Sequence, residues 1–257
     1  MRFRPCIDIH NGSVKQIVGG SLKDEADQAK ENFVSDLEAD FYAELYKKNG
    51  LKGGHIIILN PEGSTYYEAD VEQAKKALAA YPGGLQIGGG INDRNAAKFL
   101  DMGAQSVIVT SFVFKDGQIN LKNLEALSSA VGRERLVLDL SCRRKDGAYY
   151  IVTDRWQHFT DVRVCHETLD MLSEYCSEYL IHAVDVEGKA KGIEGDLAVL
   201  LGEWGKLPMT YAGGVGSFQD LSMLKQLSKD KLDVTIGSAL DIFGGSMDYE
   251  RVIKMCT

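Results

Sequence analysis

Two aspartates in similar surroundings are the residues of this sequence best suited to acid–base chemistry. Asp8 lies in the string CIDI and Asp139 in the string VLDL, so each stands near the end of a short apolar run. A carboxylate in such a place is costly to remove from water unless it has a partner or a function. Two carboxylates that share a site tend to separate their pKa values, which leaves one acid and one base near neutral pH. The pair therefore predicts general acid–base catalysis.

Glycines that follow apolar runs, together with hydroxyl residues after the next run, could bind anionic groups. A glycine lets backbone N–H groups converge on an anion, and the N-terminus of a following helix adds its dipole. The sequence contains this arrangement twice, first at Gly89, Gly90, Thr110 and Ser111 and again at Gly213, Gly214, Gly237 and Ser238. Two such sites predict a small-molecule ligand with an anionic group at each end.

An internal repeat relates these features to one another. The aspartate, the glycine pair and the serine recur in the same order, at an offset close to half of the 257 residues. A repeat of this kind constrains the whole fold, and it predicts two similar halves over about residues 1–130 and 131–257. Only four prolines are present and no low-complexity linker separates the halves, so we expect a single domain over residues 1–257.

The elements that must position these residues are apolar strands that alternate with helical segments. The strands are mostly apolar throughout, as parallel strands covered on both faces are. Eight strand–helix units in about 250 residues predict an α/β fold of the (β/α)8 TIM barrel type, built from two half-barrels. A doubly wound open sheet is the alternative, but it does not explain a twofold repeat with four units in each half.

In such a barrel the site lies where the strands end and the following loops begin. The strands that carry Asp8 and Asp139 would face each other across the ring, and the two glycine sites would lie on another diameter. The sequence also predicts a loop over 19–31, helices over 33–48 and 92–102, and a β-hairpin over 141–152 that turns at Asp146-Gly147.

The composition limits the partners that this chain can have. A formal net charge of −8 argues against nucleic acid and against a membrane surface. The sequence shows no His, Cys and carboxylate cluster with metal-ligand spacing, so we expect no metal. Five cysteines without a CxxC spacing suit a reducing compartment, and no signal peptide precedes the first strand. We therefore expect a cytoplasmic protein, or one of the plastid stroma if a transit peptide has been removed. A monomer is expected because the two halves complete one barrel.

The strings CIDIHNG, QIGGGI and AGGV resemble the histidine-biosynthesis barrels, and the ProFAR isomerase family more closely, especially its eukaryotic branch. ProFAR is phosphoribosylformimino-aminoimidazole carboxamide ribotide. The resemblance spans essentially the whole chain and implies an aldose–ketose isomerase, an intramolecular oxidoreductase that performs an Amadori rearrangement on a bisphosphorylated substrate without a cofactor. It also implies that Asp8 is the general base for the ribose C2 proton, and that Asp139 is an acid or a positioning carboxylate.

The chain departs from the bacterial pattern around the sixth strand, where it reads HAVDVEG from His182. The general acid could therefore be Asp139, Asp185 or Glu187, and we favour Asp139 and Asp185 as the partners of Asp8. Trp156 matches the residue that the family stacks over the imidazole carboxamide. A packing role for a half-buried tryptophan is an equal alternative.

Two other functions remain open from the residues. The cyclase subunit of imidazole glycerol phosphate synthase shares both aspartates and both phosphate sites, but it resembles a lyase with a lysine where this chain has Gln16. A phosphorylated-metabolite binding barrel without catalysis would keep the glycines but would not need Asp8 or Asp139. The cyclase also has an aromatic-His string after the eighth strand, where this chain reads SALD from Ser238. This difference and Gln16 favour the isomerase over the cyclase, and the two aspartates favour it over a binding barrel.

Overall fold

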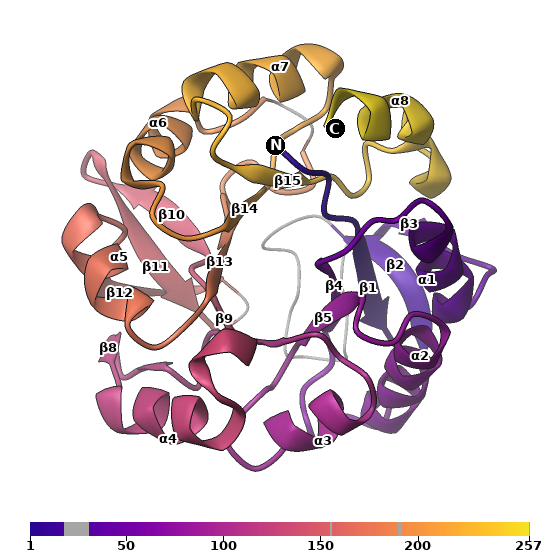
Figure 1. Ribbon diagram of the computed structural model, residues 1–257, viewed down its shortest axis with the longest axis horizontal. Coiled ribbons are helices and arrows are strands. Elements are labelled where there is room, and N and C mark those ends of the chain that lie inside the picture. Colours follow the sequence, from indigo (N-terminus) through magenta and orange to yellow (C-terminus); the bar gives the residue numbers. More distant parts are fainter. Residues whose placement is uncertain (18–30, 155, 190–191, 257) are drawn as a thin grey trace.

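The computed structural model describes residues 1–17, 31–154, 156–189 and 192–256. Within these residues, eight parallel strands form a ring that is surrounded by helices (Figure 1). In order around the ring the strands are β1 (Cys6–His10), β4 (Gly54–Ile58), β5 (Leu85–Gly88), β6 (Val107–Val109), β9 (Leu136–Asp139), β13 (Glu178–His182), β14 (Met209–Ala212) and β15 (Asp233–Thr235). The expected (β/α)8 barrel is confirmed.

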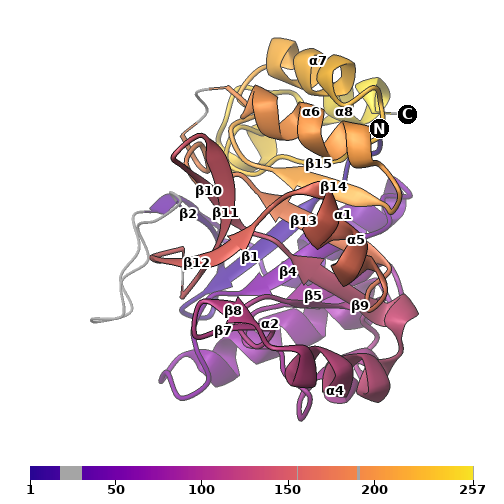
Figure 2. The same cartoon turned by 90° about the vertical axis from the view of Figure 1, so that its left-hand side faces the viewer.

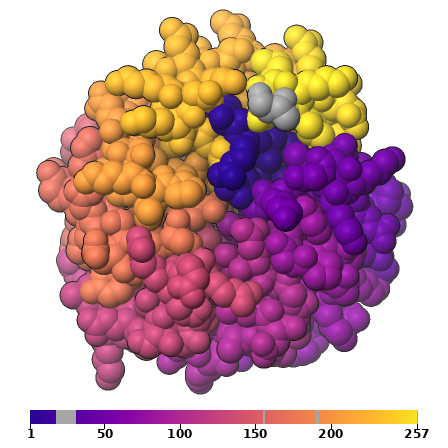
Figure 3. All heavy atoms as spheres, in the orientation of Figure 1, coloured from indigo at the N-terminus to yellow at the C-terminus, as the bar shows by residue number. Residues whose placement is uncertain are grey.

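The ring closes between its first and last strands. Phe3, just before β1, forms a parallel bridge with Val234 of β15. The amide of Arg4 donates to the carbonyl oxygen of Val234 at 2.8 Å, and the amide of Val234 donates to that of Arg2 at 3.0 Å. On the face seen in Figure 3, the indigo amino-terminal residues accordingly lie against the yellow carboxyl-terminal part of the chain. A closed barrel leaves neither of these strands with a free edge.

The helices cover the outside of the ring because each presents one apolar face to it. In α4, for example, Leu124, Leu127 and Val131 are buried at helical spacing, and the side chain of Asn120 caps the first turn by accepting from the amide of Asn123. The helices are α1 (Ala39–Lys48), α2 (Tyr67–Ala80), α3 (Ala96–Asp101), α4 (Leu121–Val131), α5 (His166–Ser173), α6 (Gly195–Trp204), α7 (Phe218–Leu227) and α8 (Tyr249–Met255). Among the described helices, none is both long enough and apolar enough to cross a membrane.

Alternation along the strands decides which side chains enter the barrel. Successive strand residues point to opposite faces. On β9, Leu138 therefore packs in the large apolar core, whereas Val137 belongs to a second, small cluster with Ile108, Leu180 and Ala212. Asp139, two residues after Val137, shares its face. The barrel interior is thus apolar at mid-height and polar where β9 ends.

A buried ion cluster lies at the amino-terminal ends of the strands. The Nε atom of Arg4 is 2.9 Å from Oδ2 of Asp233, and its NH2 atom is 3.7 Å from Oε2 of Glu178. Thr210 donates to the other oxygen of Glu178 at 3.3 Å. Arg4 is 4% exposed. The cluster links the segment before β1 to β13, β14 and β15, and so supports the closure of the ring.

Short antiparallel strands extend the barrel. β2 (Ser13–Ile17) and β3 (Glu31–Val34) continue from β1, a separate sheet contains β10 (Cys142–Lys145), β11 (Ala148–Thr153) and β12 (His158–Arg163), and β7 (Phe114–Lys115) pairs with β8 (Gln118–Ile119). Figure 2 shows the β10–β12 sheet at the end of the molecule away from both termini. The predicted hairpin is confirmed, and its turn residues Asp146 and Gly147 both have positive φ values.

Two expected helices begin later than their spacing suggested. The helix expected over 33–48 begins at Ala39, because residues 31–34 pair with β2 instead. The helix expected over 92–102 begins at Ala96, because Asn92 and Asn95 use their side-chain oxygens to accept from nearby backbone amides. Most of the loop expected over 19–31 lies outside the described residues.

Candidate active site

A cavity of about 570 Å³ opens at the carboxyl ends of the barrel strands. Apart from Asp185, every residue that the sequence singled out for the site lines it: Asp8, Asp139, Trp156, Gly89, Gly90, Thr110, Ser111, Gly213, Gly214, Gly237 and Ser238. Residues from both halves of the chain therefore share one space. A cavity of this size is typical of a site for a small molecule.

Asp8, near the end of β1, is the carboxylate on the first half of the barrel. The amide nitrogen Nε2 of Gln16 donates to its Oδ2 atom at 3.2 Å. Burial, and then the negative charge of Glu187, raise the pKa of Asp8 from 3.8 to about 7. A carboxyl group with this pKa can gain and lose a proton near neutral pH, as a general base must.

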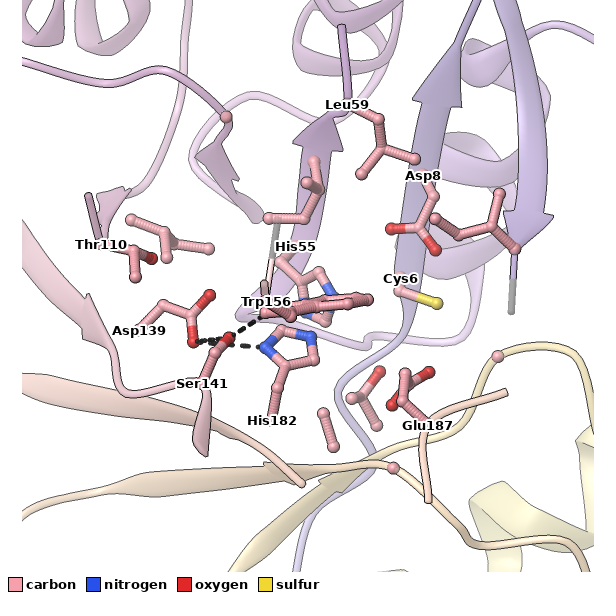
Figure 4. A pocket seen from close by; sticks show the side chains of 18 of the residues that line it. Cys6, Asp8, His55, Leu59, Thr110, Asp139, Ser141, Trp156, His182 and Glu187 are labelled. Carbon is pink, nitrogen blue, oxygen red and sulfur yellow. Dashed lines mark hydrogen bonds and ion pairs between the residues drawn. The ribbon is translucent and has the colours of Figure 1, made fainter. Parts of the chain in front are cut away.

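Asp139, at the end of β9, belongs to a chain of hydrogen bonds from the second half (Figure 4). Its Oδ1 atom accepts from Oγ of Ser141 at 2.8 Å and lies 3.3 Å from Nδ1 of His182. Nε1 of Trp156 in turn donates to Oγ of Ser141 at 3.0 Å. Burial raises the pKa of Asp139, but the charge and hydrogen bonds of His182 and Ser141 outweigh it, so that the net pKa lies below its ordinary value. Asp139 is therefore an anion at neutral pH.

His182, the last residue of β13, is a residue whose role the sequence did not identify. Burial lowers its pKa, but the adjacent carboxylate of Asp139 more than compensates and raises it to about 9. The ring of Trp156 lies 5.8 Å from the imidazole centroid at an angle of 42°. His55 meets the imidazole edge-on at 6.2 Å, and burial lowers the pKa of His55 to about 3. His182 and His55 are thus a charged and a neutral imidazole in contact with each other.

Glu187 enters the cavity from the loop after β13. Its Oε2 atom is buried and, within the described residues, has no hydrogen-bond partner. Burial raises the pKa of Glu187, although the positive charge of His182 acts in the opposite direction. An unpaired buried carboxyl oxygen is costly, and a polar group of a ligand would satisfy it.

Asp185 lies outside the cavity, which differs from the expectation that it faces the reacting centre. Its Oδ1 atom accepts from Nε of Arg143 at 2.8 Å, and its Oδ2 atom accepts from the amide of Arg144 at 2.9 Å. Both partners belong to the β10–β11 hairpin. Asp185 therefore anchors the hairpin, and of the two carboxylates after β13 it is Glu187 that lines the site.

The two glycine loops repeat one backbone geometry. Gly89 follows β5 with φ +103°, and Gly213 follows β14 with φ +113°, a region that side chains rarely adopt. A Cβ atom at Gly89 would lie 2.0 Å from the carbonyl oxygen of Ile58, and one at Gly213 would lie 2.8 Å from that of Ala183. These glycines are required by close backbone contact. At Gly90, by contrast, a Cβ atom would meet nothing within 4 Å.

The described residues contain no group of three or more His, Cys, Asp or Glu side chains that could hold a metal ion. What the cavity does contain is a carboxyl group that titrates near neutrality, facing a charged pair of Asp139 and His182. Such an arrangement can move protons between two sides of a bound molecule.

The chain is similar to known proteins over nearly its whole length. A model of the family described as "Histidine biosynthesis protein" matches residues 2–248. The chain is similar to a chloroplastic protein of Medicago truncatula, at 52% identity over 98% of this chain and 81% of the relative. It is also similar to proteins of Yarrowia lipolytica, at 49% identity over 95% and 93%, and of Saccharomyces cerevisiae, at 45% over 96% and 94%. All three relatives are named as 1-(5-phosphoribosyl)-5-((5-phosphoribosylamino)methylideneamino) imidazole-4-carboxamide isomerases.

Proposed function

Because the chain belongs to the histidine biosynthesis protein family, we propose that it is the isomerase that converts the aminoaldose ProFAR to the aminoketose PRFAR. The reaction is an Amadori rearrangement within the ribosylamine. A hydrogen leaves C2 and another joins C1, so C2 is oxidised as C1 is reduced. This makes the enzyme an intramolecular oxidoreductase. The observation that carries the proposal is the pair of acid–base groups, Asp8 and the Asp139–His182 pair, on two sides of one cavity.

The repeated loops would hold the two phosphate groups of the substrate. One phosphate would lie at Gly90, Thr110 and Ser111, and the other at Gly214 and Ser238, since all of these residues line the cavity. Backbone amides can bind phosphate without a basic side chain, which suits a chain of net charge −8. The reacting ribose would then lie between the two ends, near the carboxyl groups.

Asp8 would be the general base that removes the C2 proton. Its pKa of about 7 makes it basic enough to accept a proton and still ionised at slightly alkaline pH. Asp139 is held as an anion, so we assign it a role in orienting its neighbours instead of donating the proton that opens the ring. Trp156 would stack on the imidazole carboxamide, fixed by its hydrogen bond to Ser141.

The proposal also covers the oligomeric state of the enzyme and its location in the cell. We propose a monomer, because the ring closes within one chain through Phe3 and Val234. We also propose that it acts in the cytosol or the plastid stroma, the second being consistent with the chloroplastic relative. Light scattering of the purified protein would test the first point.

The activity test is direct conversion of ProFAR, followed by coupling the product to the next enzyme. The Asp8→Asn variant should lose about 10²–10⁴-fold in kcat, because a general base contributes about that much, while product binding measured by calorimetry stays close to wild type. Asp101→Asn, at an exposed carboxylate on α3, is the matched control and should keep full activity. Near wild-type turnover by Asp8→Asn would contradict the assignment of the base.

A further inference from the structure

His182 lies where the second half of the barrel brings a proton donor to the cavity. Its Nδ1 atom faces Oδ1 of Asp139 at 3.3 Å, and Nε2 is on the opposite edge of the ring (Figure 4). Trp156, from the turn between β11 and β12, and His55, from β4, contact the ring. An imidazole held in this way by a carboxylate has a fixed orientation, and its other nitrogen, Nε2, can be presented to a bound molecule.

The groups that face His182 favour its charged form. Asp139 comes from β9, Asp8 from β1 and Glu187 from the loop after β13, and the negative charges of all three raise the pKa of the imidazole. His55, on β4, is the other titratable group in ring contact, and it is held neutral. The charge of His182 and the hydrogen bonds from His182 and Ser141 hold the pKa of Asp139 below its ordinary value despite its burial, so Asp139 remains an anion.

We propose that His182 is the acid that protonates the furanose oxygen of the substrate, and that Asp139 is a positioning residue that acts through His182. The inference rests on the proposed isomerase function and names the group that opens the ring. The proton donor is then an imidazolium on the strand next to Asp139, and not one of the carboxylic acids expected from the sequence.

The protons balance within the site. His182 gives the proton of Nε2 to the ring oxygen as the C1–O bond breaks, and the amine lone pair forms C1=N. Asp8 removes the C2 proton, the C–H electrons form C1=C2, and the nitrogen regains its lone pair. The neutral imidazole then takes the proton of the C2 hydroxyl while Asp8 returns its proton to C1, which gives the ketone. Both groups end as they began, so no further reactant is needed.

The first experiment is the pH dependence of kcat/KM for the wild type, His182→Gln and Asp139→Asn with ProFAR. We expect the wild-type rate to fall as the pH rises above about 9, where His182 loses its proton. His182→Gln should lower kcat about 10²–10⁴-fold with little change in KM, and should remove this alkaline limb. Asp139→Asn should shift the limb to lower pH, because the imidazolium loses its anion. The control His166→Gln, at an exposed position of α5, should change nothing.

The second experiment needs no substrate. The chain has five histidines, so the 1H–15N spectrum of histidine-labelled protein is simple. The signal that is absent in His182→Gln should be that of a doubly protonated ring at pH 7.5. If that variant does not fold, the ring that titrates together with the alkaline limb of wild-type kcat/KM serves instead. A neutral ring at pH 7.5 in every buried histidine, or an unchanged kcat in His182→Gln, would overturn the inference. A wild type that does not convert ProFAR would refute the proposed function instead.

Discussion

Replacing Asp8 by asparagine should make the protein more stable, although the variant loses its base. Folding raises the pKa of Asp8 from 3.8 to about 7, so the folded chain binds the proton of Asp8 more tightly than the unfolded chain. The stability that this carboxyl contributes is therefore complete below about pH 4 and is lost as the pH rises through about 7. An asparagine carries no charge at any of these pH values, and its side-chain oxygen can still accept from Gln16.

The size of the effect follows from the shift. Each pKa unit corresponds to about 1.4 kcal/mol, so a shift of about three units destabilises the fold by at most about 4 kcal/mol above pH 8. Asp8 is only partly buried at the edge of an open cavity, which reduces the cost. We expect Asp8→Asn to gain about 2 to 4 kcal/mol in the free energy of unfolding at pH 8.5, and about half of that at pH 5.5.

The assay is urea unfolding at the two pH values, with Asp101→Asn as the control that should match the wild type at both. Stability no higher than wild type for Asp8→Asn at pH 8.5, or a difference that does not grow with pH, would refute the reasoning. The expected result would mean that the folded state is destabilised in order to hold a base in place, a common conflict between stability and activity.

The structure makes two further predictions. Gly89→Ala should lower the free energy of unfolding by about 3 kcal/mol or more, because its Cβ would lie 2.0 Å from the carbonyl oxygen of Ile58, whereas Gly90→Ala should cost about 1 kcal/mol and mainly raise KM. Equal losses of stability in the two variants, measured in urea, would contradict this. Arg4→Met should cost about 3 kcal/mol, because it leaves the buried Glu178 without its cation and leaves Asp233 with Arg2 alone. KM should stay unchanged, since Arg4 does not line the cavity, and a raised KM would contradict this expectation.

Residues on strands could be placed from the sequence because a strand has a simple period and this chain repeats itself. The position of Asp139 follows from that of Asp8 through the internal repeat, and the alternation of side chains turns Asp139 into the barrel together with Val137. The glycines after β5 and β14 could be found for the same reason. The sequence could predict that these glycines bind an anion, but not that Gly89 must lack a side chain because of Ile58. That contact depends on the distance between neighbouring strands.

Residues on loops could not be placed in this way. Asp185 and Glu187 are separated by one residue, yet only Glu187 lines the cavity. The partner that holds Asp185 elsewhere is Arg143, which is 42 positions away in the sequence and comes from the inserted hairpin. No local pattern records such a contact. The later start of α1 has a similar cause, because residues 31–34 gain more from pairing with β2 than from a first helical turn.

Because the ring closes at Phe3 and Val234, the two halves of the barrel could follow each other in either order along the chain. The amino terminus and the carboxyl-terminal end of the described chain lie side by side in Figures 1 and 2, away from the β10–β12 sheet. The chain also turns at Gly132, between α4 and β9, where the first repeat passes into the second. A circular permutant that joins the old termini and begins at Gly132 would place the second half before the first and keep every strand beside its present neighbours. The arrangement of strands in the ring therefore does not depend on which half comes first in the chain.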